Sequence, residues 1–146
     1  MAEPGLERLG AGVALLGTVR KDGSPRISPV EACVSEGELV FGAMPWSLKA
    51  ADLARDPRCV LHSAVSDPNG AEGELKLYGR VEEAPPHVRE GRSDVWWSGR
   101  PEEDARVFVL RIEQAVFVAW DTEAGAVTMR RWSPKRGLSV SDRSYP

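Results

Sequence analysis

Short segments of strand-like composition, separated by turn residues, run through most of this 146-residue chain. This pattern favours small antiparallel β architectures, because short strands are stable only when neighbouring strands pair with them. The segments Val13–Val19 and Arg26–Val34 flank Lys21-Asp22-Gly23-Ser24, and Asp-Gly between two strands is a strong hairpin signal. Pro29 has no N–H to donate, so its strand is expected to lie at an edge or to carry a bulge there.

The rest of the chain contains one clear helix pattern and several more strand patterns. In Ser47–Asp56, alanine and leucine recur at helical spacing, Ser47 is a suitable N-cap, and Pro57 ends the helix. Ala84–Asp104 is less regular and is interpreted as a short helix plus a loop. Further strands are predicted at Leu39–Phe41, after a turn at Ser35–Glu38, and at Arg58–Val65, Glu74–Glu82, Val107–Ile112, Ala115–Trp120 and Val127–Trp132. Glu74–Glu82 alternates well, with Leu75, Leu77 and Val81 on one face and Lys76, Tyr78 and Arg80 on the other.

This order of elements predicts a mainly β fold, a six- to seven-stranded antiparallel barrel with one or two short helices. An alternating βαβ sheet would need a helix after most strands. There are no internal repeats, so residues 1–146 are expected to form a single domain. Residues 1–12 are interpreted as a lead-in, and residues 138–146 as a tail that is ordered only if a partner holds it.

Composition and charge exclude several classes of protein. The net charge is −3 and the pI is about 5.5, whereas nucleic-acid-binding proteins usually present a basic face. No segment is apolar enough to cross a membrane and the N-terminus lacks signal-peptide features, so a cytoplasmic location is expected. The two cysteines, Cys33 and Cys59, are too few for a disulfide framework and are interpreted as buried thiols.

Motifs for several common chemistries are missing from the sequence. Gly10-Ala11-Gly12 precedes a strand instead of following one, so it is no dinucleotide fingerprint. There is no phosphate loop, nucleophile elbow or zinc-protease helix. His62 and His87 lie on a predicted strand and in a proline-rich loop, and no metal site is expected from them. His62 is interpreted as a partly buried strand residue whose ring finds a hydrogen bond.

The start of the predicted helix is the one place that suggests a ligand. A helix N-terminus carries partial positive charge and unpaired amide donors, so a lysine in the first turn opposes the dipole. Lys49 makes sense there if an anion binds, because amides, the Ser47 hydroxyl and the ammonium group would then converge on it. Arg26, on the neighbouring hairpin strand, would complete the cradle. A solvated lysine on a surface helix is the alternative.

The segment before this helix, Gly42-Ala43-Met44-Pro45-Trp46, suggests room for a flat ring. Small residues let a ring approach the backbone closely, and Trp46 would cover the ring. Simple packing of the tryptophan beside the proline remains the alternative.

Three segments resemble the FMN-binding split barrels related to pyridoxamine 5′-phosphate oxidase, including actinobacterial binders of the deazaflavin F420. They are GTVRKDGSPRISPV (Gly17–Val30), SLKAADLARDPR (Ser47–Arg58) and GELKLYGRV (Gly73–Val81), within a resemblance that runs from about Val13 to about Leu138. The resemblance implies a Greek-key split barrel and a homodimer with two equivalent cofactor sites at the interface.

The resemblance also implies which residues hold the cofactor. The phosphate would lie at Ser47 and Lys49 with help from Arg26, the ring along Gly42–Trp46, and polar strand residues near the ring. Trp132, Arg131 and the tail would reach the site of the partner. The full set implied is Arg26, Ser28, Gly42, Ala43, Met44, Pro45, Trp46, Ser47, Lys49, Glu74, Lys76 and Trp132.

Departures from the family pattern narrow the expected function. Leu48 and Glu31 stand where the vitamin B6 oxidases carry basic phosphate ligands. Arg136 is followed by Gly137-Leu138 in place of an Arg-x-His signature, so vitamin B6 oxidation is not expected. The longer anionic tail of F420 would need further basic groups, for which Arg55, Arg58 and Arg80 are candidates.

Two classes of function follow. The first is an FMN- or F420-dependent oxidoreductase that exchanges a hydride with a small conjugated substrate. The substrate pocket would then be shaped by Trp46, His62, Trp96 and Trp97. The second is a non-catalytic flavin- or haem-binding protein for storage, sensing or delivery, and a haem would require His62 or His87 as its axial ligand. A split barrel that has lost its cofactor is a further option.

Overall fold

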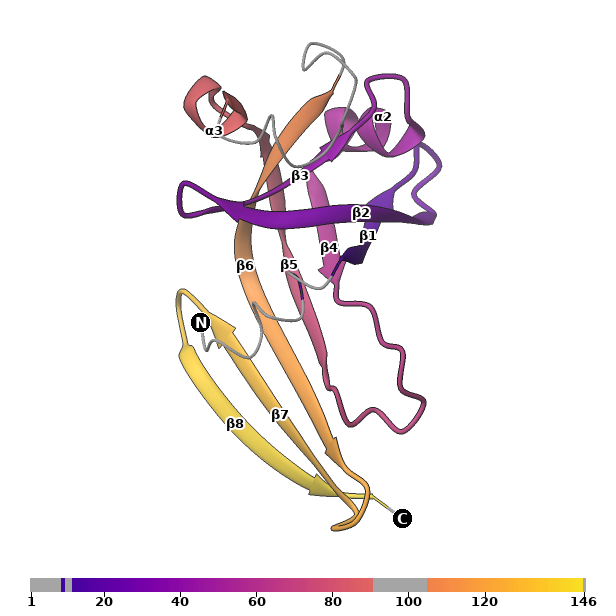
Figure 1. The fold of residues 1–146 in the computed structure, drawn as a ribbon, viewed down its shortest axis with the longest axis vertical. Helices are drawn as coiled ribbons and strands as arrows, with labels where there is room; N and C mark the ends of the chain where they lie inside the picture. Colours follow the sequence, from indigo (N-terminus) through magenta and orange to yellow (C-terminus); the bar gives the residue numbers. More distant parts are fainter. Residues whose placement is uncertain (1–8, 10–11, 91–104, 146) are drawn as a thin grey trace.

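The structure is a computed structural model in which residues 9, 12–90 and 105–145 are described (Figure 1). Six antiparallel strands form a closed barrel in the order β3-β2-β1-β4-β5-β6, which closes through pairing of β3 with β6. The strands β7 and β8 continue the sheet beyond β6. The described residues thus form one antiparallel sheet with short helices, which confirms the predicted mainly β fold. The barrel strands are β1 (Val13–Val19), β2 (Pro25–Ser35), β3 (Glu38–Ala43), β4 (Arg58–His62), β5 (Glu74–Glu83) and β6 (Arg106–Asp121).

The first three strands form the predicted meander of two hairpins. The β2–β3 turn places Glu36 and Gly37 at φ values of 49° and 78°, the left-handed conformation that suits a tight hairpin. Pro29 pairs with Leu15 of β1, whereas β2 pairs with β3 only over residues 32–35. Pro29 therefore lies on a stretch of β2 that has a single paired neighbour, where a missing N–H costs no ladder hydrogen bond.

The helix α2 (Leu48–Arg55) lies between β3 and β4 in the chain, at the end of the molecule where α3 (Pro86–Glu90) also lies (Figure 1). Ala50 and Leu53 of α2 join the main core, which is filled by alternate strand residues such as Leu16, Leu61 and Leu77. On β5, the predicted alternation is confirmed: its leucines and its valine face inward, and its charged residues face outward.

Residues 106–121 form one long strand, so the predicted division into Val107–Ile112 and Ala115–Trp120 is wrong. The pairing with β5 shifts register between Tyr78 and Gly79, because Glu113 is an extra residue with no partner opposite it. An extra residue moves the side chains that follow it to the opposite face of the strand. In the sequence, this break in the alternation looks like the end of one strand and the start of another.

The prediction of a tail at residues 138–146 is also corrected. Gly137–Ser144 form strand β8, which pairs antiparallel with β7 (Ala126–Ser133) over its whole length. All eight residues of β8 are exposed. This strand cannot be recognised in the sequence, because serine, glycine and charged residues carry little strand signal when neither face of a strand is buried.

No helix among the described residues is long and apolar enough to span a membrane.

Candidate functional site

Helix α2 and strand β2 bring one group of the predicted site residues together. Arg26 and Ser28 alternate with outward-facing residues on β2, and both are partly buried. Arg26 reaches Asp52 of α2, and Lys49 Nζ donates a hydrogen bond to the carbonyl oxygen of Pro29 at 3.1 Å. These two contacts join α2 to β2, with Lys49 in the first turn of the helix and Asp52 in the turn that follows.

Ser47 is the N-cap of α2, as predicted. Its side-chain oxygen accepts a hydrogen bond from Ala50 N at 3.3 Å and donates one to the carbonyl oxygen of Met44 at 2.7 Å. The first turn of α2 contains no acidic residue. Since no described residue accepts a hydrogen bond from the amides of Leu48 and Lys49, this helix start has donors and partial positive charge to offer an anion.

The loop that leads into α2 carries the residues predicted to line a ring. Gly42 and Ala43 end strand β3, and Ala43 is buried. Trp46 is 80 % exposed and Leu48 is 63 % exposed, which is unusual for large apolar side chains. The structure therefore places an uncovered apolar surface directly beside the helix start.

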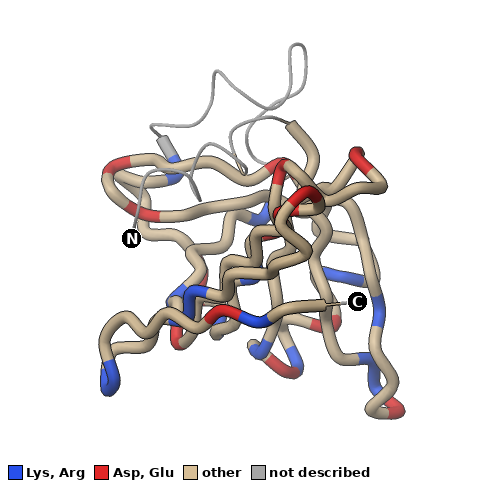
Figure 2. Tube along the Cα trace, turned by 90° about the horizontal axis from the view of Figure 1, so that it is seen from below, with Lys and Arg blue, Asp and Glu red and all other residues tan. Residues whose placement is uncertain are grey.

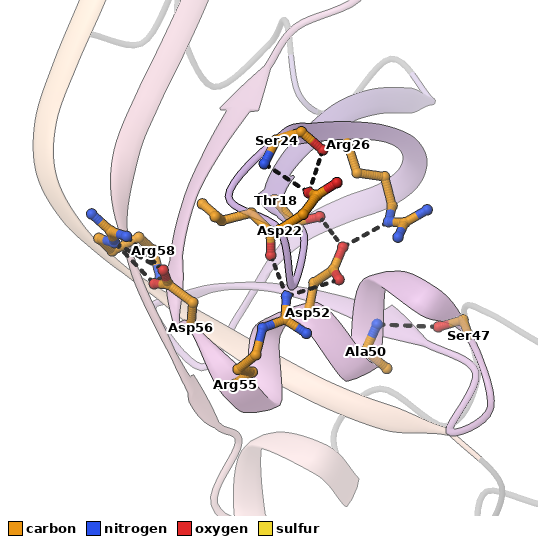
Figure 3. A network of polar contacts seen from close by, with 11 residues as sticks. Thr18, Asp22, Ser24, Arg26, Ser47, Ala50, Asp52, Arg55, Asp56 and Arg58 are labelled. Carbon is orange, nitrogen blue, oxygen red and sulfur yellow. Dashed lines mark hydrogen bonds and ion pairs between the residues drawn. The ribbon is translucent and has the colours of Figure 1, made fainter.

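A buried carboxylate of α2 holds two arginines (Figure 3). Asp52 is 3 % exposed, and its Oδ2 accepts hydrogen bonds from Arg26 Nε at 2.6 Å and from Thr18 Oγ1 at 2.9 Å. Its Oδ1 accepts from Arg55 Nη2 at 3.1 Å, and Arg55 also donates to the carbonyl oxygen of Val19 at 2.5 Å. Asp52 was not singled out in the sequence, where its only signal is an acidic residue beside Leu53 on the buried side of the helix.

The protonation state of Asp52 follows from these contacts. Burial by itself would raise the pKa of Asp52, but the hydrogen bonds from Arg26, Thr18 and Arg55 outweigh it and lower the pKa below the usual value of 3.8. Asp52 is therefore ionised near neutral pH, and the ion pairs with both arginines persist.

We expect acid to remove this stabilisation. Because the pKa of Asp52 is lower in the folded state, its contribution is fully present above the unfolded pKa of 3.8 and is lost as the pH falls through the folded pKa. Denaturant unfolding of the wild type and of Asp52→Asn between about pH 6 and pH 3 measures this effect. The difference in stability should shrink on acidification, and a constant difference would contradict the assignment.

The remaining predicted site residues lie elsewhere in the chain. Glu74 and Lys76 form an ion pair on the outward face of β5, and Glu74 Oε2 lies 3.4 Å from His62 Nε2. In the six-stranded barrel, β5 is three strands away from β2 in either direction. Trp132 lies on β7, outside the barrel, and is 36 % exposed. The chain by itself therefore does not bring Glu74, Lys76 and Trp132 to the start of α2.

The three arginines considered for a longer anionic tail all form ion pairs. Arg55 contacts Asp52, Arg58 contacts Asp56 at 2.6 Å, and Arg80 contacts Glu113 at 3.1 Å. Their charges are already partly neutralised by carboxylates of the same chain.

Other candidate groups give no site within the described residues. His62 Nδ1 lies 2.6 Å from the carbonyl oxygen of Ser63, so this nitrogen carries the proton and both ring nitrogens have a neighbour. No three His, Cys, Asp or Glu side chains in the described part of the chain gather as metal ligands. Burial raises the pKa of the Cys59 thiol to about 12, which leaves it unreactive. Trp96 and Trp97 lie outside the described residues.

Comparison with known proteins identifies the family. A family model described as pyridoxamine 5′-phosphate oxidase matches residues 7–119. The chain belongs to the pyridoxamine 5′-phosphate oxidase family. The match covers the barrel from β1 to most of β6, and it includes the start of α2. A search of curated proteins found no match.

Solved structures support the fold of this family member. Its fold is similar to PhzG from Burkholderia lata 383, solved with tetrahydrophenazine-1-carboxylic acid (TM-score 0.66, 10 % identity, 92 % of this chain and 82 % of that chain). It is also similar to a pyridoxamine 5′-phosphate oxidase-related, FMN-binding protein from Nostoc punctiforme PCC 73102 (TM-score 0.65, 13 % identity, 97 % of this chain and 93 % of that chain). A third structure of similar fold is that of a haem-binding protein from Mycobacterium smegmatis (TM-score 0.62, 16 % identity, 99 % of this chain and 89 % of that chain).

Proposed function

We propose that this chain binds FMN at the start of α2 and acts as an oxidoreductase, transferring a hydride between the flavin and a small conjugated substrate other than a B6 vitamer. The observation that carries the proposal is a helix start with unpaired amides that holds Ser47 and Lys49 beside exposed Trp46. Arg26 of β2 contacts the next turn of the same helix. Such a site suits a ligand with a phosphate at one end and a flat apolar ring at the other.

The residues around the helix start fit a phosphate monoester. Lys49 keeps donors beyond the one used on Pro29, and Arg26 is held through Nε, which leaves its two terminal nitrogens for an anion. When bound, FMN would supply the hydride chemistry at its N5 atom. The protein would contribute the position of the ring and the exclusion of water.

FMN fits these residues better than F420. The longer tail of F420 carries additional negative charges. Arg55 and Arg58 already use a terminal nitrogen on a carboxylate, and Arg80 lies on β5, three strands away from β2. A haem-binding function would need a histidine to ligate iron. Both nitrogens of His62 have neighbours, and His87 lies on α3 and not at the start of α2.

Titration of the purified protein with FMN and with F420, after recording its absorbance spectrum, tests the cofactor. We expect saturable binding of FMN, followed by turnover of reduced FMN with small conjugated acceptors. Binding of FMN without turnover of any acceptor would favour a storage or delivery protein. Binding of neither compound would overturn the proposal.

Lys49→Ala is expected to weaken FMN binding tenfold or more, which corresponds to about 1.4 kcal/mol for one lost charged hydrogen bond. Riboflavin, which lacks the phosphate, should bind the variant and the wild type alike. Fluorescence quenching of each flavin measures both constants. Unchanged FMN affinity would remove Lys49 from the site.

We further propose that two copies of this chain complete the site as a homodimer. Trp132, Leu138 and Val140 lie on one exposed face of the β7–β8 hairpin, in register with the core-facing residues of β6. The hairpin contains Arg130, Arg131, Lys135, Arg136 and Arg143 against a single acidic residue, Asp142 (Figure 2). The hairpin has a charge of +4 in a chain whose net charge is −3, so the rest of the chain has a charge of −7. The basic hairpin therefore complements the acidic remainder of a second copy.

Substitution on β8 tests the dimer. Leu138→Asp should yield monomers in light scattering and weaken FMN binding, because a charge would be buried in an apolar interface. Ser141→Asp is the matched control, since Ser141 is exposed on the opposite face of the same strand. A wild-type monomer that binds FMN would contradict a cofactor site at the interface.

A further inference from the structure

Asp52 is the residue through which the basic cluster is built. It is almost completely buried, and it accepts hydrogen bonds from β1, β2 and its own helix. A buried carboxylate is stable only when it is fully hydrogen-bonded, and here Thr18, Arg26 and Arg55 supply the donors. Asp52 itself has little surface left with which to touch a ligand.

Arg26 and Arg55 approach Asp52 from opposite sides (Figure 3), and they differ in how their terminal nitrogens are used. Arg55 uses one terminal nitrogen for both Asp52 and the carbonyl oxygen of Val19, so it acts as a bridge between α2 and β1. Arg26 binds Asp52 through Nε alone, and its two terminal nitrogens donate to no other described residue. The guanidinium group of Arg26 is thus fixed at one edge and open at the other.

We infer that Asp52 is a positioning residue that orients Arg26 toward the phosphate of the bound flavin. This inference rests on the proposed function and deepens it. A side chain that is already held in place loses less conformational entropy when the ligand arrives, and the planar group can then offer two parallel N–H donors. The 2.6 Å contact between Nε and Oδ2 sets the plane in which those donors lie.

Two effects of the carboxylate oppose each other. Its negative charge weakens the attraction of the cluster for an anion, whereas its hydrogen bond holds Arg26 in place. Asp52→Asn and Asp52→Glu separate the two effects. Asparagine loses the charge but keeps an oxygen that accepts from Arg26, and glutamate keeps the charge but moves the carboxylate by one methylene group.

The experiment measures the affinity of each variant for FMN and for riboflavin. The ratio of the two affinities isolates the contribution of the phosphate group. If Asp52 positions Arg26, Asp52→Ala and Asp52→Glu should each lower the FMN affinity about tenfold or more without changing riboflavin binding. Asp52→Asn should stay within about threefold of the wild type. In an Arg26→Ala background, Asp52→Ala should have no further effect.

Arg55→Ala is the matched control, because it removes an ion pair from the same carboxylate but leaves Arg26 untouched. Its FMN-to-riboflavin ratio should equal that of the wild type, even where thermal unfolding shows a loss of stability. If Asp52→Ala does not fold, Asp52→Glu decides the question. An unchanged ratio in Asp52→Glu would overturn the positioning role alone. A wild type that does not prefer FMN to riboflavin would overturn the phosphate site itself.

Discussion

Gly79→Ala is expected to lower the free energy of unfolding by about 3 kcal/mol. Gly79 lies at the register shift between β5 and β6, where the two backbones approach closely. A Cβ atom at this position would lie 2.0 Å from the carbonyl oxygen of Arg111 and 2.9 Å from its carbonyl carbon. Backbone atoms at a bulge move only if the strand pairing moves with them. Denaturant unfolding followed by tryptophan fluorescence measures the loss.

Gly17→Ala is the matched control for this substitution. Gly17 is also a strand glycine, but its added Cβ would meet the Cγ1 atom of the Val60 side chain at 2.7 Å, with the nearest backbone atom at 3.7 Å. A side chain can move where a backbone carbonyl cannot, so the loss in Gly17→Ala should be smaller. Equal losses in the two variants would show that the close approach at Gly79 does not determine the barrel's stability.

Phe41→Ala is expected to cost about 3–5 kcal/mol of folding stability. Phe41 is fully buried, and its ring lies 5.8 Å from the ring of Phe108, measured between centroids. The two residues are register partners in the β3–β6 pairing that closes the barrel. Removing the ring therefore leaves a cavity at the seam, directly before the loop that leads to the candidate site. The unfolding midpoint in urea reports this loss.

Trp46→Ala separates stability from binding in the same region. Since Trp46 is 80 % exposed, its removal should change stability by less than about 0.5 kcal/mol. It should nevertheless weaken FMN binding if the indole covers the flavin ring. A Phe41→Ala protein as stable as Trp46→Ala would contradict the packing role assigned to the β3–β6 seam.

Local signals in the sequence were sufficient to predict the hairpins and helix α2. The Asp22-Gly23 turn, the Ser47 cap and Pro57 each act within a few residues, so the limits of β1 and α2 could be predicted closely. The alternation on β5 likewise predicted which of its side chains face the core. The family resemblance, carried by the segments around the same elements, was confirmed by the family match.

The candidate site could be predicted only in part, because its residues belong to elements that are distant in the sequence. Ser47 and Lys49 were found through the helix start alone. Thr18, Arg26 and Asp52 meet only after β1, β2 and α2 have packed, and an aspartate within a helix gives no sign of which arginine it will hold. The placement of Glu74 and Lys76 away from α2 follows from the strand order of the closed barrel.

The sequence by itself determined the local elements, the mainly β class and the polar chemistry at the start of α2, since turn, cap and alternation signals act over a few residues. Only the tertiary structure decided the continuity of β6 across Glu113, the pairing of β8 with β7, and the ionic contacts of Asp52. These features depend on which strands become neighbours, and strand pairing is set by burial and register across the whole sheet.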